Sequence, residues 1–207
     1  MDLFFYFLSI DLDTVEFYTD GSLAENKSSG KMIMGSEWVS LHGNRSFCCK
    51  TSTWPSSTRA ELLAIYTALL TVPNNKSVVI KTDSQAAIDR IKKSSTFIKK
   101  FQWTNISNHT LIYNISHITK FKSLSVEYVK VKEHSGLDEN DMADNMANLG
   151  RISDQHFDAN HSIASNTLYI PLWNNTTIET PIRRFIRDLN QTAHQADWLI
   201  NRPIRDY

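Results

Sequence analysis

"FYTDGS" (residues 17–22) ends a β-prone run with an aspartate that is followed at once by glycine and serine. An Asp-Gly pair between two strands is a common signal for a tight hairpin. Here the following residues, "LAENKSSG", are polar, and the next β-like run begins only near Lys31, so a tight hairpin is disfavoured. The alternative is that Asp20 lies at the carboxyl end of a strand, with little bulk around it, open to a ligand or a metal.

The composition predicts a folded protein with a neutral total charge. The 207 residues are 41% hydrophobic and 21% charged, and the formal net charge is zero. A chain of this length forms one ordinary domain with an appendage, or two very small domains. Charge is unevenly distributed, because residues 81–101 contain six basic and two acidic side chains. This basic stretch leaves nucleic acid open as a partner despite the neutral total.

The cysteines and the N-terminus predict an intracellular protein, cytoplasmic or nuclear. Cys48 and Cys49 are neighbours, and neighbours on a strand point to opposite faces, so a mutual disulfide would be strained. We therefore expect a reducing compartment. The N-terminal run "LFFYFLSI" is too short to span a bilayer, and Asp2 replaces the positive flank of a signal peptide. We expect no membrane partner.

The spacing of apolar residues predicts a mixed sheet flanked by helices. Three strand-like runs, at 15–20, 32–40 and 45–52, are joined by polar turns and indicate an antiparallel meander. A buried helix follows over 57–72, opened by a capping box between Thr58 and Glu61. Strands and helices then alternate, which predicts parallel strands: strand 77–84, a helix from Ser84, a helical segment over 103–118, strand 123–132 and a final helix over 138–150.

The character of the chain changes after Gly150, so we divide it into an N-terminal extension (1–13), a main domain (14–150) and a C-terminal extension (151–207). The last part contains a polar linker, an isolated β-like run at 167–173 and an amphipathic helix. Thr180 is the expected N-cap, Pro181 occupies the first turn, and an apolar stripe follows: Ile182, Phe185, Ile186, Leu189, Ala193, Ala196 and Ile200. Two interpretations stay open. The helix packs back on the domain, or its apolar face contacts another protein or a segment of a longer polyprotein.

Three more carboxylates lie, like Asp20, at the edges of predicted elements: Glu61, Asp83 and Asp144. Each has a structural explanation of its own, since Glu61 completes a capping box, Asp83 can cap the next helix and Asp144 can be solvated. Taken together they suggest a site, because Asp20 and Asp83 end two strands at one sheet edge and the helix of Glu61 packs across that sheet. Clustered carboxylates repel one another unless a cation neutralises them. Oxygen ligands without cysteine or histidine favour Mg²⁺ or Mn²⁺ over zinc.

Four segments resemble the signature of the type 1 ribonuclease H family: "YTDGS", "TRAELLAIYTAL", "IKTDSQAA" and "VKVKEHSGLDENDMADNMA". The spacing is also similar, with 22 residues from Glu61 to Asp83 and 10 from His134 to Asp144. The similarity covers roughly residues 14–150, and "DSQAA" is most like the ribonuclease H domains of retrotransposon polyproteins. It implies the ribonuclease H-like fold, with a C-terminal helical appendage added here.

The resemblance implies an endonuclease that hydrolyses the RNA strand of RNA/DNA hybrids by two-metal-ion catalysis. Asp20, Glu61, Asp83 and Asp144 would hold two Mg²⁺ ions, for which Mn²⁺ can substitute. One ion would activate a water and the other would stabilise the leaving 3′ oxygen. In the family the histidine matching His134 assists proton transfer or product release.

The resemblance also implies where the hybrid binds. Backbone groups of Gly21 and Ser22 and side chains in the first turn of the helix of Glu61 would contact RNA through its 2′-hydroxyls. In that turn Ser57 stands where the family usually places asparagine, and a hydroxyl lacks the reach of an amide. The other members of the predicted interface are Thr58, the matching Arg59, and Asn140, which lies at the family position before Asp144.

The DNA strand is expected along the basic stretch, near Ser84 and Gln85, where helix N–H groups attract phosphate. Five basic residues supply charge there: Arg90, Lys92, Lys93, Lys99 and Lys100. Aromatic residues of the same stretch either stack on sugars or bases or belong to the core: Phe97, Phe101 and Trp103.

Two other hypotheses stay open. One is an integrase or transposase of the same superfamily that cuts DNA. The other is a catalytically dead mobile-element remnant that binds nucleic acid. The loop His134-Ser135-Gly136 and the late Asp144 favour ribonuclease H over integrase, and the intact acidic positions argue against decay.

Overall fold

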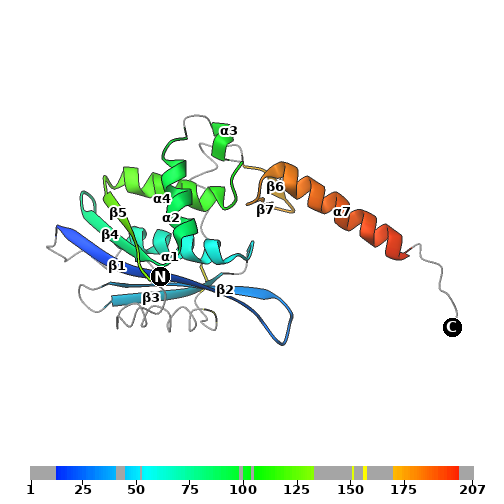
Figure 1. The fold of residues 1–207 in the computed structure, drawn as a ribbon, viewed down its shortest axis with the longest axis horizontal. Helices are drawn as coiled ribbons and strands as arrows, with labels where there is room; N and C mark the ends of the chain where they lie inside the picture. Colours follow the sequence, from blue (N-terminus) through cyan, green and yellow to red (C-terminus); the bar gives the residue numbers. More distant parts are fainter. Residues whose placement is uncertain are drawn as a thin grey trace.

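The computed structural model describes residues 13–40, 45–51, 53–97, 100–103, 105–132, 151, 156–157 and 170–200. Within these ranges five strands form one mixed sheet in the order β3–β2–β1–β4–β5 (Figure 1). The first three make the antiparallel meander: β1 (Thr14–Glu25), β2 (Met32–Ser40) and β3 (Arg45–Thr51). The next strands add in parallel, β4 (Ser77–Thr82) beside β1 and β5 (Ser125–Lys130) beside β4. The mixed five-stranded sheet predicted from the sequence is confirmed.

One helix lies at the centre of the molecule. Helix α1 (Ser57–Thr71) packs against β1 and β2, and α4 (His109–Phe121) packs on α1 (Figure 1). Helix α2 (Gln85–Ser94) contacts α1 and α4, and the short α3 (Lys100–Trp103) lies beside α4. Because α1 is covered by the sheet on one side and by helices on the other, its residues are buried nearly all round, as its sequence predicts.

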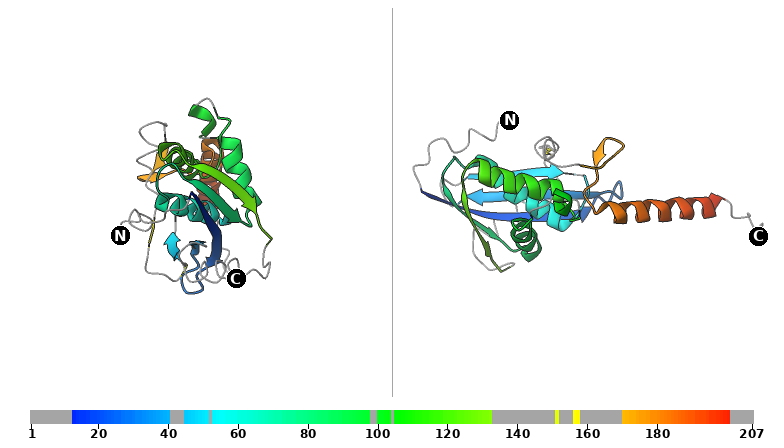
Figure 2. Two further views of the ribbon diagram at one scale, coloured as in Figure 1. Left: turned by 90° about the vertical axis from the view of Figure 1, so that its left-hand side faces the viewer. Right: turned by 90° about the horizontal axis from the view of Figure 1, so that it is seen from above.

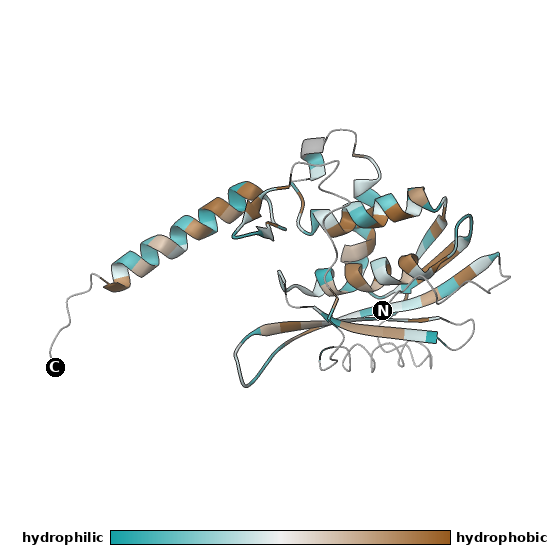
Figure 3. Ribbon diagram, turned by 180° about the vertical axis from the view of Figure 1, so that it is seen from behind, coloured by the Kyte–Doolittle hydropathy of each residue, from teal (hydrophilic) through white to brown (hydrophobic). Residues whose placement is uncertain are grey.

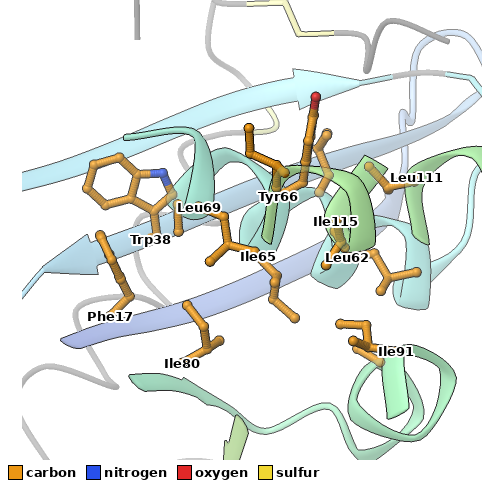
Figure 4. Packing of buried hydrophobic residues seen from close by; sticks show 14 of the residues in the cluster. Phe17, Trp38, Leu62, Ile65, Tyr66, Leu69, Ile80, Ile91, Leu111 and Ile115 are labelled. Atoms are coloured by element: carbon orange, nitrogen blue, oxygen red, sulfur yellow. The ribbon is translucent and has the colours of Figure 1, made fainter. Parts of the chain in front are cut away.

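The core fills the space between the sheet and α1. Phe17 of β1 meets the edge of Trp38 of β2, with ring centroids 5.3 Å apart, and Trp38 stacks on Phe47 of β3 at 6.0 Å. Ile65 and Leu69 of α1 belong to the same cluster and point toward these rings (Figure 4). Each such buried side chain contributes about 1.5–3 kcal/mol through the hydrophobic effect. This packing holds the sheet and α1 in a fixed relative position.

The start of α1 differs from the prediction. Its N-cap is Ser56, whose Oγ accepts a hydrogen bond from the Arg59 N–H at 3.1 Å. The predicted capping box of Thr58 and Glu61 is therefore wrong, because a hydroxyl two residues earlier satisfies the helix end. The Glu61 carboxylate is thus not part of a cap.

The elements after β4 also differ in detail. Ser84 caps α2 by accepting a hydrogen bond from the Ala87 N–H at 3.3 Å, so the alternative explanation of Asp83 as the helix cap does not hold. The helical segment expected over 103–118 is two helices, because Asn108 adopts the left-handed conformation (φ 60°) immediately before α4. Asparagine tolerates that conformation better than most residues. The final helix predicted over 138–150 lies outside the described residues.

The C-terminal extension contains a small hairpin. Strands β6 (Leu172–Trp173) and β7 (Thr176–Thr177) pair antiparallel. The two residues between them, Asn174 and Asn175, have φ angles of 47° and 61°, as a tight type I′ turn requires. The β-like run predicted at 167–173 is therefore not isolated, since its last two residues pair with β7.

Helix α7 (Ile182–Ile200) follows the hairpin. The carbonyl of Pro181 accepts hydrogen bonds from the N–H groups of Arg184 and Phe185 at 2.9 and 3.0 Å. Pro181 therefore precedes the first helical residue, and the N-cap predicted at Thr180 is one residue too early. Among the described helices, none combines the length and the apolar composition that crossing a bilayer requires.

A substitution at Gly21 tests how tightly β1 and α1 approach. A Cβ atom there would lie 2.3 Å from the Glu61 nitrogen and 2.5 Å from the Ala60 carbonyl carbon, and neither backbone atom can move alone. We expect Gly21→Ala to destabilise the protein by about 1–3 kcal/mol, the usual cost of overpacking. Urea unfolding measures the change, with Thr14→Ala at the exposed start of β1 as control. Equal stability of the two variants would contradict the close approach.

Candidate active site

Three carboxylates converge at one edge of the sheet. Ligand oxygens of Asp20, Glu61 and Asp83 all lie within 4.8 Å of one another. The strand register explains the first pair: Thr19 of β1 is level with Thr82, the last residue of β4, so Asp20 and Asp83 lie side by side. Strand β1 continues to Glu25, so the expectation that Asp20 ends its strand is wrong. Glu61 reaches them from α1, because α1 approaches β1 at the side-chain-free Gly21. Sequence reasoning predicted this convergence for these three residues.

Without a bound cation, the three carboxylates repel one another. Glu61 is 6% exposed. Burial, and then the charges of Asp20 and Asp83, raise its pKa well above the ordinary value. Hydrogen bonds from the Gly21 backbone and from Thr82 Oγ1, the latter at 3.4 Å, act in the opposite direction and only partly compensate. The site therefore favours either a proton on Glu61 or a cation between the carboxylates.

The donor set fits a hard divalent cation. The three residues offer only carboxylate oxygens, which Mg²⁺ and Mn²⁺ prefer, and the described part of the cluster contains neither cysteine nor histidine. Asp83 is also held through its main chain, since Lys130 Nζ donates to its carbonyl oxygen. Asp144, His134 and Asn140, the other predicted members of the site, lie outside the described residues.

The predicted substrate-binding residues surround this cluster at different depths. Gly21 and Ser22 continue β1 beyond Asp20 and are half-buried. Ser57 is exposed and Thr58 is half-buried at the start of α1. Thr58 lines a polar hollow with residues from four other segments: Ser56, Arg90, Asn108, Glu179 and Arg184.

Along α2 the predicted DNA-binding residues are mostly accessible. Gln85 is exposed and donates to Asp89 at 2.8 Å, while Ser84 is half-buried as the helix cap. Lys92 and Lys93 are exposed in the last turn. They present positive charge on the solvent face of α2.

The aromatic residues of the basic stretch belong to the core where they are described. Trp103 is 8% exposed, and its ring meets the edge of Phe97 at 5.2 Å and that of Tyr113 at 5.1 Å. The core alternative therefore holds for Phe97 and Trp103. The side chain of Phe101 lies outside the described residues.

Arg59 lies in an internal network that the sequence did not indicate. It is 6% exposed, and its Nη1 lies 3.2 Å from Glu179 Oε1 and 3.5 Å from Asn108 Oδ1. Glu179 also accepts hydrogen bonds from the N–H and hydroxyl of Thr110. Nearby His109 is buried, and that burial lowers its pKa against the opposing effect of Glu179. Arg59 therefore holds the C-terminal segment through Glu179 instead of facing solvent. The sequence around Glu179 contains no motif that predicts this ion pair.

Glu37 is a second residue that sequence reasoning missed. It lies opposite Asp20 on β1 and opposite Cys48 on β3, and its side chain is fully buried. Its carboxylate oxygens have no hydrogen-bond partner within the described part of the chain. Burial, and then the charge of Asp20, raise the pKa of Glu37 to about 9. The one signal in the sequence is a lone acid inside the apolar run "MIMGSEWVS".

Comparisons with known proteins agree with this geometry. The family model described as RNase H matches residues 13–152. The fold is similar to that of the foamy viral protease-reverse transcriptase solved in complex with dsDNA, with 20% identity, a TM-score of 0.52, and coverage of 66% of this chain and 93% of that one. It is also similar to LC9-RNase H1, a type 1 RNase H with the type 2 active-site motif, with 18% identity, a TM-score of 0.53, and coverage of 75% and 82%. No curated protein matches the chain.

Removing the charge of Glu61 tests whether the cluster is built for a cation. In EDTA at neutral pH we expect Glu61→Gln to unfold at a higher temperature than the wild type, because it relieves repulsion by Asp20 and Asp83. Mg²⁺ or Mn²⁺ should raise the melting temperature of the wild type and have little effect on the variant. Thermal unfolding measures both, with exposed Glu127→Gln as control. An unchanged metal response in Glu61→Gln would refute this role of Glu61.

The buried acid predicts a pH dependence of stability. A folded-state pKa of about 9 against 4.5 means that the folded protein retains a proton that the unfolded chain releases. The contribution of Glu37 to stability is therefore complete below pH 4.5 and is lost progressively as the pH rises towards 9. As the pH rises from 5 to 8.5, we expect the free energy of unfolding of Glu37→Gln to increase relative to that of the wild type by more than about 1.4 kcal/mol, the equivalent of one pKa unit. Urea unfolding in EDTA at the two pH values tests this, and a constant difference between the proteins would show that Glu37 titrates normally.

Proposed function

The chain belongs to the RNase H family, and on that premise we propose that it is an endonuclease that hydrolyses the RNA strand of RNA/DNA hybrids. The observation that carries the proposal is the convergence of Asp20, Glu61 and Asp83 within 4.8 Å. Three carboxylates held this close, one of them buried, destabilise the metal-free protein. Such a cost is expected where the charges hold a catalytic cation.

In this proposal Asp20, Glu61 and Asp83 hold two Mg²⁺ ions, or Mn²⁺, together with Asp144. The ions supply the charge that lowers the pKa of a water and stabilises the leaving 3′ oxygen. Glu61 must be ionised to act as a ligand. Because its pKa is raised, Glu61 is readily protonated as the pH falls, and protonation competes with metal binding. We expect His134 to assist proton transfer or product release. The products are a 5′-phosphate and a 3′-hydroxyl.

The surroundings of the cluster support a double-stranded substrate. Gly21 and Ser22 lie on one side of the carboxylates, and Ser57 and Thr58 lie at the start of α1. Hydroxyls and backbone groups of this kind suit the 2′-hydroxyls of an RNA strand. The exposed lysines of α2, together with Ser84 and Gln85, suit the phosphates of the DNA strand. Asn140 is proposed to join the RNA contacts.

A cleavage assay with three substrates tests the proposal. The full chain is incubated with Mg²⁺ and end-labelled RNA/DNA hybrid, duplex DNA or duplex RNA, and we expect cleavage only of the RNA strand of the hybrid. Asp20→Asn should reduce the rate by more than about 10²-fold, the scale for losing one preorganised electrostatic group. The matched control is Asp13→Asn, whose side chain is fully exposed just before β1.

Each other outcome identifies a competing hypothesis. Cleavage of duplex DNA would indicate an integrase or transposase activity. Binding of the hybrid without cleavage, in a chain that still responds to Mg²⁺, would indicate a catalytically dead remnant. Cleavage that survives Asp20→Asn would mean that a contaminating nuclease or another site is responsible.

A further inference from the structure

Helix α7 leaves the domain and extends into solvent. It contains 19 residues, none of which is buried (Figures 1 and 2). Its first turns contact the rest of the described chain: the ring of Phe185 lies 6.1 Å from that of Trp54 and 5.8 Å from that of Trp173. Beyond Leu189 every residue of the helix is exposed.

The exposed helix carries a seam of apolar residues. Successive members are separated by four and three residues in strict alternation, from the first to the last residue of the helix: Ile182, Ile186, Leu189, Ala193, Ala196 and Ile200. Figure 3 shows apolar residues recurring along α7. A mean spacing of 3.5 residues is the repeat with which two helices supercoil around each other. Ile186 is 49% exposed and Ile200 is 79% exposed, and Ala193 and Ala196 are exposed as well, whereas Ile182 and Leu189 are half-buried. The described chain therefore leaves most of this seam uncovered.

The seam is complementary to itself when two copies run antiparallel. Pairing the helices about Gln191 places Ile182 opposite Ile200 of the partner subunit and Ile186 opposite Ala196 of the partner subunit. Leu189 then faces Ala193 of the partner subunit, so a large side chain meets a small one in each inner layer. A parallel pair would instead stack alanine on alanine in two consecutive layers and leave a gap there, which close packing disfavours.

Charge favours the same orientation. The first half of α7 carries Arg183, Arg184 and Arg187, while its acids are Asp188 and Asp197. A parallel pair would bring all six arginines to one end, where like charges repel. An antiparallel pair separates the two arginine groups to opposite ends of the seam. Asp197 of the partner subunit then lies level with Phe185, within one turn of Arg183 and Arg184.

We propose that α7 is a dimerisation helix that pairs antiparallel with α7 of a second copy of this chain. The seam extends over about 28 Å, at 1.5 Å per residue. Such an interface is small, so the dimer forms reversibly in a concentration-dependent manner. The proposal is independent of the catalytic activity, because no residue of the carboxylate cluster takes part.

Sedimentation of the full chain over a range of concentrations tests the proposal. We expect a monomer–dimer equilibrium, and Leu189→Ala should raise the dissociation constant by more than about tenfold, because each dimer loses two buried leucines. Adding Ala193→Leu to that variant exchanges the large and small positions and should restore dimerisation. The control Gln191→Ala changes the polar face and should leave it unchanged. Circular dichroism verifies that α7 stays helical in each variant.

Cross-linking tests the orientation. Ile186→Cys and Ala196→Cys chains, when mixed and oxidised, should form a disulfide with each other, whereas each alone should cross-link no more than the wild type with Cys48 and Cys49. Cross-linking of Ile186→Cys with itself would indicate a parallel pair and would overturn the proposal. A chain that stays monomeric at all concentrations would also overturn it, and the seam would then belong to a different protein. A dimer unaffected by Leu189→Ala would place the interface elsewhere.

Discussion

The close approach of β1 and α1 at Gly21 is the constraint on which the site depends. Without a side chain at that position, the backbone of α1 comes near enough for Glu61 to join Asp20 of β1 and Asp83, which follows β4. Burying a carboxylate beside two others is unfavourable, and the protein offsets that cost with packing elsewhere. Phe17, Trp38 and the apolar face of α1 supply this packing directly behind the site. Strand β1 and helix α1 therefore supply both core side chains and carboxylates of the site.

The C-terminal segment is joined to the domain by a buried charge network. Glu179 is 3% exposed and pairs with Arg59, and Ile178 beside it is equally buried. A buried ion pair contributes little by itself, but losing one partner leaves an uncompensated charge. A domain that ended at residue 150 would leave Arg59 without its carboxylate partner. Ile178 and Glu179 therefore belong energetically with α1 and α4, whereas every residue of α7 beyond Leu189 is exposed.

The features that could be predicted from the sequence are those that neighbouring residues specify through a local pattern. Alternating apolar residues indicated the meander, and the end of an apolar strand indicated where Asp83 would lie. The end predicted at Asp20 was wrong, because β1 continues to Glu25. The cap at Ser56 was missed because Thr58 offers the same chemistry two residues later. The Arg59–Glu179 pair joins residues 120 positions apart, and no periodicity reports such a contact. Whether Phe97 and Trp103 were core or surface depended on the docking of α4, which the local pattern does not specify.

Asp20 and Glu37 show why neighbouring acids on one sheet have different roles. They are directly opposite each other in the β1–β2 ladder, so the charge of Asp20 adds to the effect of burial in raising the pKa of Glu37. Asp20 is half-buried on β1, just beyond the point where the neighbouring β4 ends, and it shares that place with Glu61 and Asp83, where a cation can be held. Glu37 is fully buried within the sheet, and burial keeps it protonated at neutral pH. A protonated Glu37 adds no negative charge beside the cluster. The negative charge at the proposed metal site therefore comes from Asp20, Glu61, Asp83 and the predicted ligand Asp144, and not from Glu37.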